Sequence, residues 1–367
     1  MNWNEILPCG QPDFRNLLAV LRREKPSRPT LFEFYLNERL YEKLVPGAKA
    51  RLKENSNGTT DEVDGLAYSG SILAQTLRME AYRRAGYDYV TVIVPGFKFP
   101  SNRSYDARTV SLNEGAMIHD WASYEAYPWP DPEKADYSLL EAMGTNLPDG
   151  MKLIVYGPGG VLENVIELVG YEPLCYLLAD DPKLAAAIFE QVGRRMVRYY
   201  ELAAPYSQVG ACLSNDDWGY KTQTMISPRQ LRQYVFPWHK QIAEVVHAAG
   251  KPLILHSCGH FERIISDLED IGIDARHSYE DVILPVEQAY ERYHDKFAIL
   301  GGIDLDFICR ATPEEVYTRA RNLLQQTEKY GGYALGTGNS VPDYVPDENY
   351  FAMLRAVLET REKKVVR

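Results

Sequence analysis

Residues 251–280 of the chain read KPLILHSCGHFERIISDLEDIGIDARHSYE and contain two short apolar runs with a helical stretch between them. The runs Pro252–Cys258 and Asp274–Glu280 are bounded by Gly and polar residues and have the length of buried strands. Between them, Phe261–Ile271 carries apolar residues at three- and four-residue spacing, which is typical of a helix. A strand, a helix and a second strand in this order predict one unit of a parallel sheet.

The same alternation continues in both directions along the chain. We predict eight strands, which are Pro29–Leu36, Tyr87–Pro95, Met151–Tyr156, Val209–Asp216, Pro252–Cys258, Asp274–Glu280, Phe297–Asp304 and Tyr333–Gly338. The clearest helical stretches are Ser71–Ala85, Pro173–Ala203, Pro228–Ala249, Phe261–Ile271, Pro313–Tyr330 and Asn349–Arg361. Ser227-Pro228 and Thr312-Pro313 open two of them with helix-capping signals. Eight strand–helix units predict an α/β chain folded as a single-domain (β/α)₈ TIM barrel over residues 1–367.

An open, doubly wound sheet is the competing architecture. Such a sheet usually has a Gly-rich phosphate loop after its first strand, whereas the first strand here runs directly into Asn37-Glu38-Arg39. The closed barrel is therefore the better prediction.

A long, aromatic-rich insertion, Gly96–Gly150, follows the second predicted strand. Its aromatic residues include Tyr105, Trp121, Tyr124, Tyr127 and Trp129. It is either an outer decoration packed on the barrel or a lid over the catalytic mouth, because loops that follow barrel strands lie on the catalytic face.

Composition restricts the class of protein. The formal net charge of −11 disfavours binding to nucleic acid, whose phosphates would be repelled. There is no apolar run of membrane-spanning length, and the first residues, MNWNEILPCG, do not resemble a signal peptide. The five cysteines are scattered without a C-x-x-C motif, which fits a reducing cytoplasm. We interpret four of them as packing residues: Cys9, Cys175, Cys212 and Cys309.

Polar residues gather where the predicted strands end, which is where barrel enzymes place their catalytic groups. His256 and Cys258 are two residues apart on one strand, so their side chains point to the same face. An imidazole and a thiolate there can bind one soft divalent ion, or the pair can be a buried histidine beside an inert core cysteine. Glu280 ends the neighbouring strand. A His, a thiolate and a carboxylate on adjacent strand ends suit zinc with one open position.

Longer motifs extend this pattern across the chain. They are NDDWGYKTQTMISP (Asn215–Pro228), Pro237, LILHSCG (Leu253–Gly259), IGID (Ile271–Asp274), LGGIDLD (Leu300–Asp306) and GTGNSVPDYVPDENY (Gly336–Tyr350). Taken together, they resemble the uroporphyrinogen decarboxylase superfamily over nearly the whole chain. The resemblance implies a (β/α)₈ barrel, in agreement with the strand count.

The true decarboxylases of this superfamily are metal-free and carry an Arg-rich motif after strand one that holds the carboxylate arms of a tetrapyrrole. In the corresponding stretch here, only Arg39 matches one of those arginines, while Glu33 and Glu38 add negative charge. Bidentate arginines are hard to replace in carboxylate recognition. Asp216 or Asp217 can match the acidic residue that these enzymes place at the pyrroles. A decarboxylase of a tetrapyrrole or another polycarboxylate is therefore the second hypothesis for the function.

The other branch is similar to corrinoid-dependent methyltransferases, which pass a methyl group from a methyl-corrinoid protein to a thiol. The resemblance implies a zinc site in which His256, Cys258 and Glu280 match the family's ligands, whereas Thr337 stands where a later cysteine is expected. It predicts zinc as cofactor, a corrinoid carrier protein as partner and a small thiol as substrate. A non-catalytic barrel that binds a corrinoid or a tetrapyrrole is a third reading, and a homodimer is left open.

Further site residues are predicted from the strand ends. Asp216 and Asp217 are candidate catalytic residues together with Glu280, although one of the two aspartates can instead cap the following helix. Candidate substrate-binding residues are Glu33, Arg39, Tyr220, His277, Asp304 and Asn339. His277 can also be a partner of the metal ligands or a purely structural residue.

Overall fold

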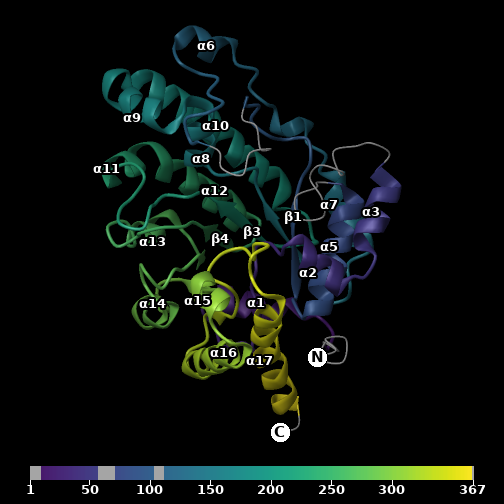
Figure 1. Cartoon of the computed structure of the whole chain (residues 1–367). Coiled ribbons are helices and arrows are strands. Elements are labelled where there is room, and N and C mark those ends of the chain that lie inside the picture. Colours follow the sequence, from purple (N-terminus) through teal and green to yellow (C-terminus); the bar gives the residue numbers. More distant parts are fainter. Residues whose placement is uncertain (1–9, 57–70, 103–110, 366–367) are drawn as a thin grey trace.

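The computed structural model describes residues 10–56, 71–102 and 111–365. Seven parallel strands form one curled sheet in the order β1 to β7, and helices surround this sheet in Figure 1. The strands are β1 (Tyr89–Ile93), β2 (Lys152–Tyr156), β3 (Val209–Asn215), β4 (Leu253–His256), β5 (Ala275–His277), β6 (Ala298–Leu300) and β7 (Tyr333–Ala334). Each lies within one of the predicted ranges, and neighbours in sequence are neighbours in the sheet, as a barrel requires.

The first predicted strand, Pro29–Leu36, is not a regular strand in the structure. It forms only a parallel bridge, Leu31 to Leu335, beside β7. On its other side, the Glu33 carbonyl accepts a hydrogen bond from the Tyr89 hydroxyl of β1 at 2.7 Å. The Phe34 carbonyl accepts one from the Thr91 hydroxyl at 2.9 Å. Because side-chain hydroxyls donate to these carbonyls, the segment connects β7 to β1 without the regular backbone hydrogen bonds of a parallel strand pair.

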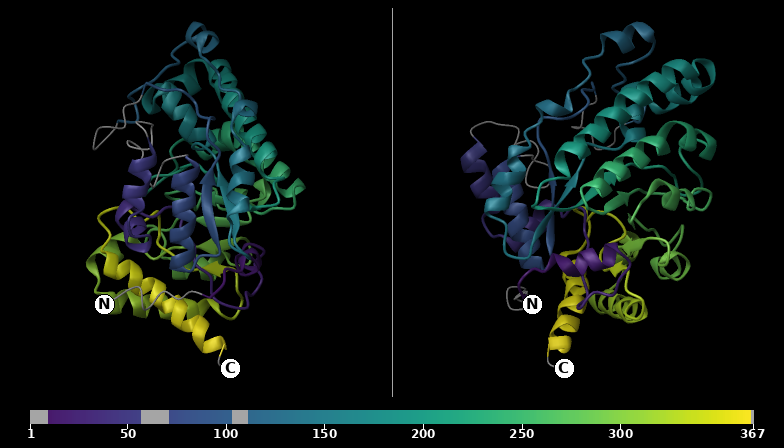
Figure 2. Two further views of the ribbon diagram at one scale, coloured as in Figure 1. Left: turned by 90° about the vertical axis from the view of Figure 1, so that its right-hand side faces the viewer. Right: turned by 180° about the vertical axis from the view of Figure 1, so that it is seen from behind.

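The helices of the described part are α1 (Phe14–Leu21), α2 (Glu38–Leu44), α3 (Ala48–Ser56), α5 (Ile72–Ala85), α6 (Trp121–Ala126), α7 (Ser138–Thr145), α8 (Val161–Val169), α9 (Tyr171–Asp180), α10 (Pro182–Ala203), α11 (Pro228–Gln230), α12 (Phe236–Ala248), α13 (Asp267–Ile271), α14 (Val286–Tyr293), α15 (Leu305–Arg310), α16 (Pro313–Thr327) and α17 (Asp347–Val365). In both views of Figure 2, α16 and α17 lie side by side at the end of the molecule remote from α6. None of the described helices is long and apolar enough to cross a lipid bilayer.

Local sequence explains where several helices begin. Ser227 and Thr312 form the predicted caps, each in a capping box with the residue three positions later. The long predicted helix 173–203 is divided between α9 and α10, because Asp181 caps the new helix and Pro182 occupies its first turn. The predicted helix 228–249 contains a π-helical turn, Leu231–Val235, before α12.

The insertion contains α6 and α7, and its aromatic side chains contact α10 and the residue that caps it. The Trp121 indole donates a hydrogen bond to Asp181 at 3.0 Å. The Arg195 guanidinium of α10 lies 5.2 Å from the centre of the Trp129 ring. These contacts anchor part of the insertion on the outer helices. Tyr105 lies outside the described residues, as does Cys9.

Candidate functional site

Three candidate metal-ligating side chains meet at the carboxyl ends of the central strands. Among the described residues, Asp217, His256 and Cys258 place one ligand atom each within 4.8 Å of one another. Asp217 follows the end of β3, and His256 ends β4. The parallel register pairs Asn215 with His256, which brings these strand ends to the same level of the barrel.

A hydrogen-bonded pair of histidines fixes the orientation of His256. Nδ1 of His256 lies 2.7 Å from Nδ1 of His277, and Nε2 of His277 lies 3.2 Å from the Thr337 carbonyl oxygen. Since a carbonyl oxygen only accepts, His277 carries its proton on Nε2 and accepts at Nδ1. His256 then donates from Nδ1, which leaves the lone pair of its Nε2 free.

Burial keeps both imidazoles neutral. Desolvation lowers the pKa of His256 to about 3, with the charge of Arg276 as a second cause. Desolvation and the neighbouring His256 lower the pKa of His277 well below its usual value. A neutral imidazole with a free ring nitrogen is the form of histidine that binds a metal.

The Cys258 sulfur is held by polar neighbours. The Asn339 side-chain amide donates a hydrogen bond to Sγ at 3.1 Å, and the Ser278 hydroxyl lies 3.3 Å from Sγ. The backbone N–H of Cys258 donates to Oδ1 of Asp217 at 2.7 Å. Burial raises the pKa of this thiol to about 12, and the carboxylates of Asp217 and Glu280 contribute to the increase. The sulfur is therefore a thiol unless a cation is close to it.

The two adjacent aspartates have different surroundings. The Asp216 carboxylate accepts hydrogen bonds from five groups: the backbone amides of Val161, Leu162 and Glu163, the Trp218 indole and Nε2 of His239. It is fully buried and holds the first turn of α8, a helix that precedes β3 in the chain. The prediction that one of the pair caps the following helix is wrong, because Ser227 caps α11. Asp217 lies in the cluster with His256 and Cys258 instead, and burial raises its pKa.

Thr337, in the position where the resemblance implies a cysteine, is bonded away from the cluster. Its backbone N–H donates to Oε1 of Glu33, and its hydroxyl lies 2.7 Å from Oε2 of Glu33. The same hydroxyl contacts the Asn339 carbonyl oxygen. A hydroxyl has one proton, so donation to that carbonyl requires Glu33 to donate to Thr337. Glu33 is then a neutral carboxylic acid, in agreement with burial that raises its pKa to about 8.

The other predicted residues lie outside the cluster. Glu280 lines a neighbouring pocket and is not one of the three clustered residues. Arg39 pairs with Asp347 at 2.9 Å and so ties α2 to the start of α17. Asp304 caps α15 through the backbone N–H of Phe307. Tyr220 is 38 % exposed and lines a cavity beside Asp217.

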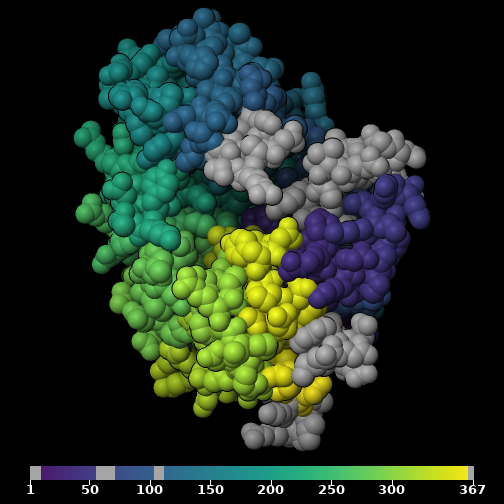
Figure 3. Space-filling model, viewed as in Figure 1, coloured from purple at the N-terminus to yellow at the C-terminus, as the bar shows by residue number. Residues whose placement is uncertain are grey.

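That cavity has a volume of about 820 Å³ and opens beside the cluster. Phe99, Glu163, Asp217, Tyr220 and Met225 are among the residues that line it. On the face seen in Figure 3, the surface is hollowed where teal residues approach the yellow C-terminal segment. A space of this size suits a small-molecule substrate. Since Phe99 belongs to the insertion, part of the insertion borders this space.

Close backbone contacts hold the loops around the cluster. A side chain at Gly259, where φ is +96°, would lie 2.2 Å from the backbone of Gly219. The loops after β3 and β4 therefore pack directly on each other, which fixes Asp217 relative to Cys258.

Sequence reasoning missed Ser278 and Glu163. Ser278 directly follows the predicted site residue His277, so its position near a strand end could have identified it as a site residue. Glu163 belongs to α8, away from any strand end, and only its contacts reveal it: the charge of Asp217 is the second cause, after burial, of its raised pKa.

Comparisons with known proteins agree with this fold. A solved methyltransferase from Methanosarcina mazei superposes with a TM-score of 0.68 at 14% identity, covering 94% of this chain and 97% of that one. This likeness shows the fold. Residues 29–36 close the curled sheet, so the arrangement is consistent with the predicted TIM barrel.

Two curated relatives are similar in sequence. A methylated-thiol–coenzyme M methyltransferase of Methanosarcina mazei is 29% identical over 194 residues, which are 53% of this chain and 49% of the relative. The chain thus spans about half the length of that relative. A uroporphyrinogen decarboxylase of Anaeromyxobacter dehalogenans is 28% identical over 256 residues, covering 66% of this chain and 69% of that one. The family model for uroporphyrinogen decarboxylase (URO-D) matches residues 117–360. The chain belongs to the URO-D family.

Proposed function

We propose that this chain is a zinc-dependent methyltransferase that moves a methyl group between a methyl-corrinoid carrier protein and a small thiol. The observation that carries the proposal is the convergence of Asp217, His256 and Cys258 beside a cavity of about 820 Å³. The sequence likeness to a thiol methyltransferase supports the reaction class.

The donor set fits zinc. Imidazole nitrogen, thiolate sulfur and carboxylate oxygen are the ordinary zinc ligands, and two ligand atoms of one tetrahedral zinc ion lie about 3.2 to 3.8 Å apart. The three candidate atoms lie within 4.8 Å of one another, so the side chains would have to approach by at most about 1 to 1.5 Å to share one ion. Three protein ligands leave a fourth position for a substrate. Asp217 takes the place predicted for Glu280 in this set, and Glu280 remains the alternative carboxylate.

The chain's own residues prepare this position. The His277 pair aims the free Nε2 lone pair of His256, and Asn339 donates to the sulfur of Cys258, which favours its thiolate form. Bound zinc would lower the pKa of a substrate thiol so that it is available as a thiolate at neutral pH. The cavity beside Asp217 holds the acceptor, and its open side admits the methyl donor on a separate carrier protein.

Decarboxylation of a tetrapyrrole is the second candidate, because curated decarboxylases also match the chain. Arg39 counts against it, since its guanidinium is engaged by Asp347 and by the carbonyls of Asp343 and Val345. Release of CO₂ from uroporphyrinogen by the purified protein would establish this reaction instead. Tight binding of a corrinoid or tetrapyrrole without turnover of either kind would indicate a non-catalytic barrel.

The test uses free methylcob(III)alamin as donor and 2-mercaptoethanol as acceptor, with demethylation followed by absorbance. The zinc-loaded wild type should demethylate the donor, and Cys258→Ser should reduce the rate at least 100-fold. Cys175→Ser is the matched control, because Cys175 is an exposed cysteine on α9 outside the cluster. Equal rates in the two variants would contradict the proposed role of Cys258, and absence of demethylation by zinc-loaded wild type would contradict the methyltransferase assignment.

A further inference from the structure

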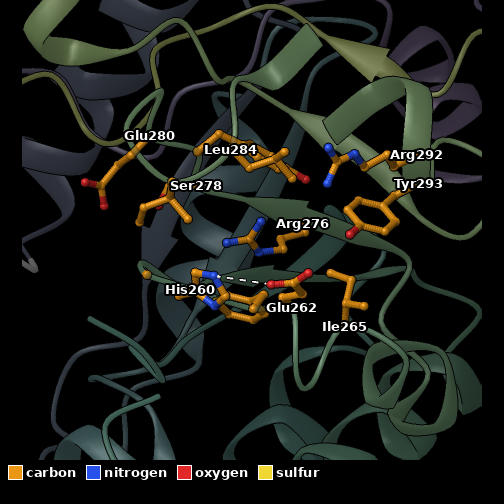
Figure 4. Close-up of a pocket in the computed structure, with 13 residues that line it drawn as sticks. His260, Glu262, Ile265, Arg276, Ser278, Glu280, Leu284, Arg292 and Tyr293 are labelled. Carbon is orange, nitrogen blue, oxygen red and sulfur yellow. Dashed lines mark ion pairs between the residues drawn. The ribbon is translucent and has the colours of Figure 1, made fainter. Parts of the chain in front are cut away.

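A second pocket lies behind the cluster, between the loop after β4 and helix α14. Figure 4 shows the guanidinium of Arg276 near its centre, surrounded by side chains that include His260, Ser278, Leu284 and Tyr293. The pocket volume is about 90 Å³, which is room for roughly three water molecules. It is therefore suited to a chemical group of a few heavy atoms.

Arg276 is a buried cation that makes no direct ion pair with a carboxylate of the described residues. The residue is 5% exposed, and among the described residues no carboxylate forms an ion pair with it. Its Nε has no hydrogen-bond partner in the described part of the chain, and one Nη makes a long contact of 3.4 Å with the Ser257 carbonyl oxygen. Buried charges are ordinarily paired, so this arrangement lacks an anion.

Two neighbouring aromatic rings lie near the guanidinium of Arg276 and leave N–H groups at its edge for hydrogen bonding. The carbon at its centre lies 3.9 Å from the centre of the Phe261 ring and 4.7 Å from that of Tyr279. The N–H groups of a guanidinium point outward in its plane, where they match the two oxygens of an oxyanion. The buried Tyr279 hydroxyl contacts the Arg276 side chain and has no other hydrogen-bond partner among the described residues. As an acceptor from Arg276, this hydroxyl keeps its own proton for donation. Arg276 and Tyr279 thus both present unused donors.

The other charged groups of the pocket do not neutralise Arg276. His260 and Glu262 pair with each other at 3.7 Å, with the Glu262 side chain 79% exposed. Glu280 and Arg292 line the rim, and Arg292 is exposed. The charge of Arg276 partly offsets the raised pKa of Asp217 and of Glu280 from a distance. Neither carboxylate forms an ion pair with the buried guanidinium.

We propose that this pocket binds a small oxyanion, a carboxylate, sulfonate or phosphate group, through Arg276 with the hydroxyls of Tyr279 and Ser278. Ser278 connects this pocket to the cluster, since its hydroxyl lies 3.3 Å from the Cys258 sulfur. An anion held there lies next to the candidate metal centre but needs none of its ligands. The binding site is independent of the proposed methyl transfer.

The test measures the melting temperature of wild-type protein with acetate, methanesulfonate or inorganic phosphate, against chloride at equal ionic strength. An anion concentration ten times the Kd should raise the melting temperature by about 2 °C. The three anions separate the sources of the oxyanion: the one that gives the largest shift identifies the preferred group. No shift with any of them beyond that of chloride would overturn the proposal.

Two variants assign the effect to the pocket. Arg276→Met should abolish the shift, whereas Arg292→Gln, which alters an exposed arginine of the same rim, should retain it. Without anion, Arg276→Met should melt no lower than wild type, because it removes an unpaired buried charge. A large loss of stability would mean that Arg276 has a protein counter-ion, and would overturn the proposal. Tyr279→Phe, which keeps the ring, should weaken anion binding about 3- to 10-fold.

Discussion

Replacement of Glu33 by Gln should stabilise the protein at alkaline pH. Glu33 is fully buried, and its pKa is raised to about 8 from a usual value of 4.5. A carboxyl whose pKa is raised by folding contributes stability that is fully present below pH 4.5 and is lost as the pH rises toward 8. Gln keeps the geometry of the neutral acid, because its carbonyl can accept from the Thr337 N–H while its amide donates to the Thr337 hydroxyl.

The magnitude follows from the two pKa values. Between pH 5 and pH 8, the wild type should lose about 3 to 4 kcal/mol of unfolding free energy through this group, and Glu33→Gln should not. Urea denaturation of both proteins at several pH values measures the difference. Glu314→Gln, at a side chain that is 76% exposed, is the control for a general effect of glutamate removal. If the difference between Glu33→Gln and wild type were independent of pH, Glu33 would be ionised in the folded protein and its assignment as a neutral acid would be refuted.

Two further substitutions test the structural assignments around the cluster. Asp216→Asn should lower the unfolding free energy by about 3 kcal/mol, because the buried carboxylate accepts from five donors and an amide can accept from fewer. Asp306→Asn is the control, because Asp306 is 66% exposed. It should change the unfolding free energy by under about 0.5 kcal/mol in the same urea titration. His277→Leu should weaken zinc binding about 10- to 100-fold in competition with a chelating dye, whereas His277→Asn, which can still accept from His256, should recover part of the affinity. Equal zinc affinity of His277→Leu and wild type would show that the histidine pair does not position His256.

Most of the sheet could be predicted from the sequence, because buried strands and periodic helices alternate in it. The irregular backbone of residues 29–36 could not be predicted from the sequence. The hydroxyls of Tyr89 and Thr91 take the place of backbone donors there, and both residues lie more than 50 positions away in the chain. The division of the predicted helix at Asp181-Pro182 follows from a cap and a proline that are visible in the sequence.

The site was predicted in part, for a physical reason. Strand spacing places His256 and Cys258 on one face, but it does not determine where side chains in the following loops point. Glu280 lies three residues beyond the end of β5, in a loop that turns it toward the neighbouring pocket. Asp217 is held in the cluster by the Cys258 amide, a contact between two loops that no spacing along the chain encodes.

The count of zinc ions per chain, in protein purified without chelator, tests the convergence of Asp217, His256 and Cys258 most directly. We predict about one zinc per chain in wild type and in Glu280→Gln, and much less than one in Cys258→Ser and Asp217→Asn after dialysis, with all four proteins folded by circular dichroism. Wild-type protein that holds no zinc and takes up none on titration would contradict the account. Loss of zinc in Glu280→Gln but not in Asp217→Asn would restore Glu280 as the carboxylate ligand.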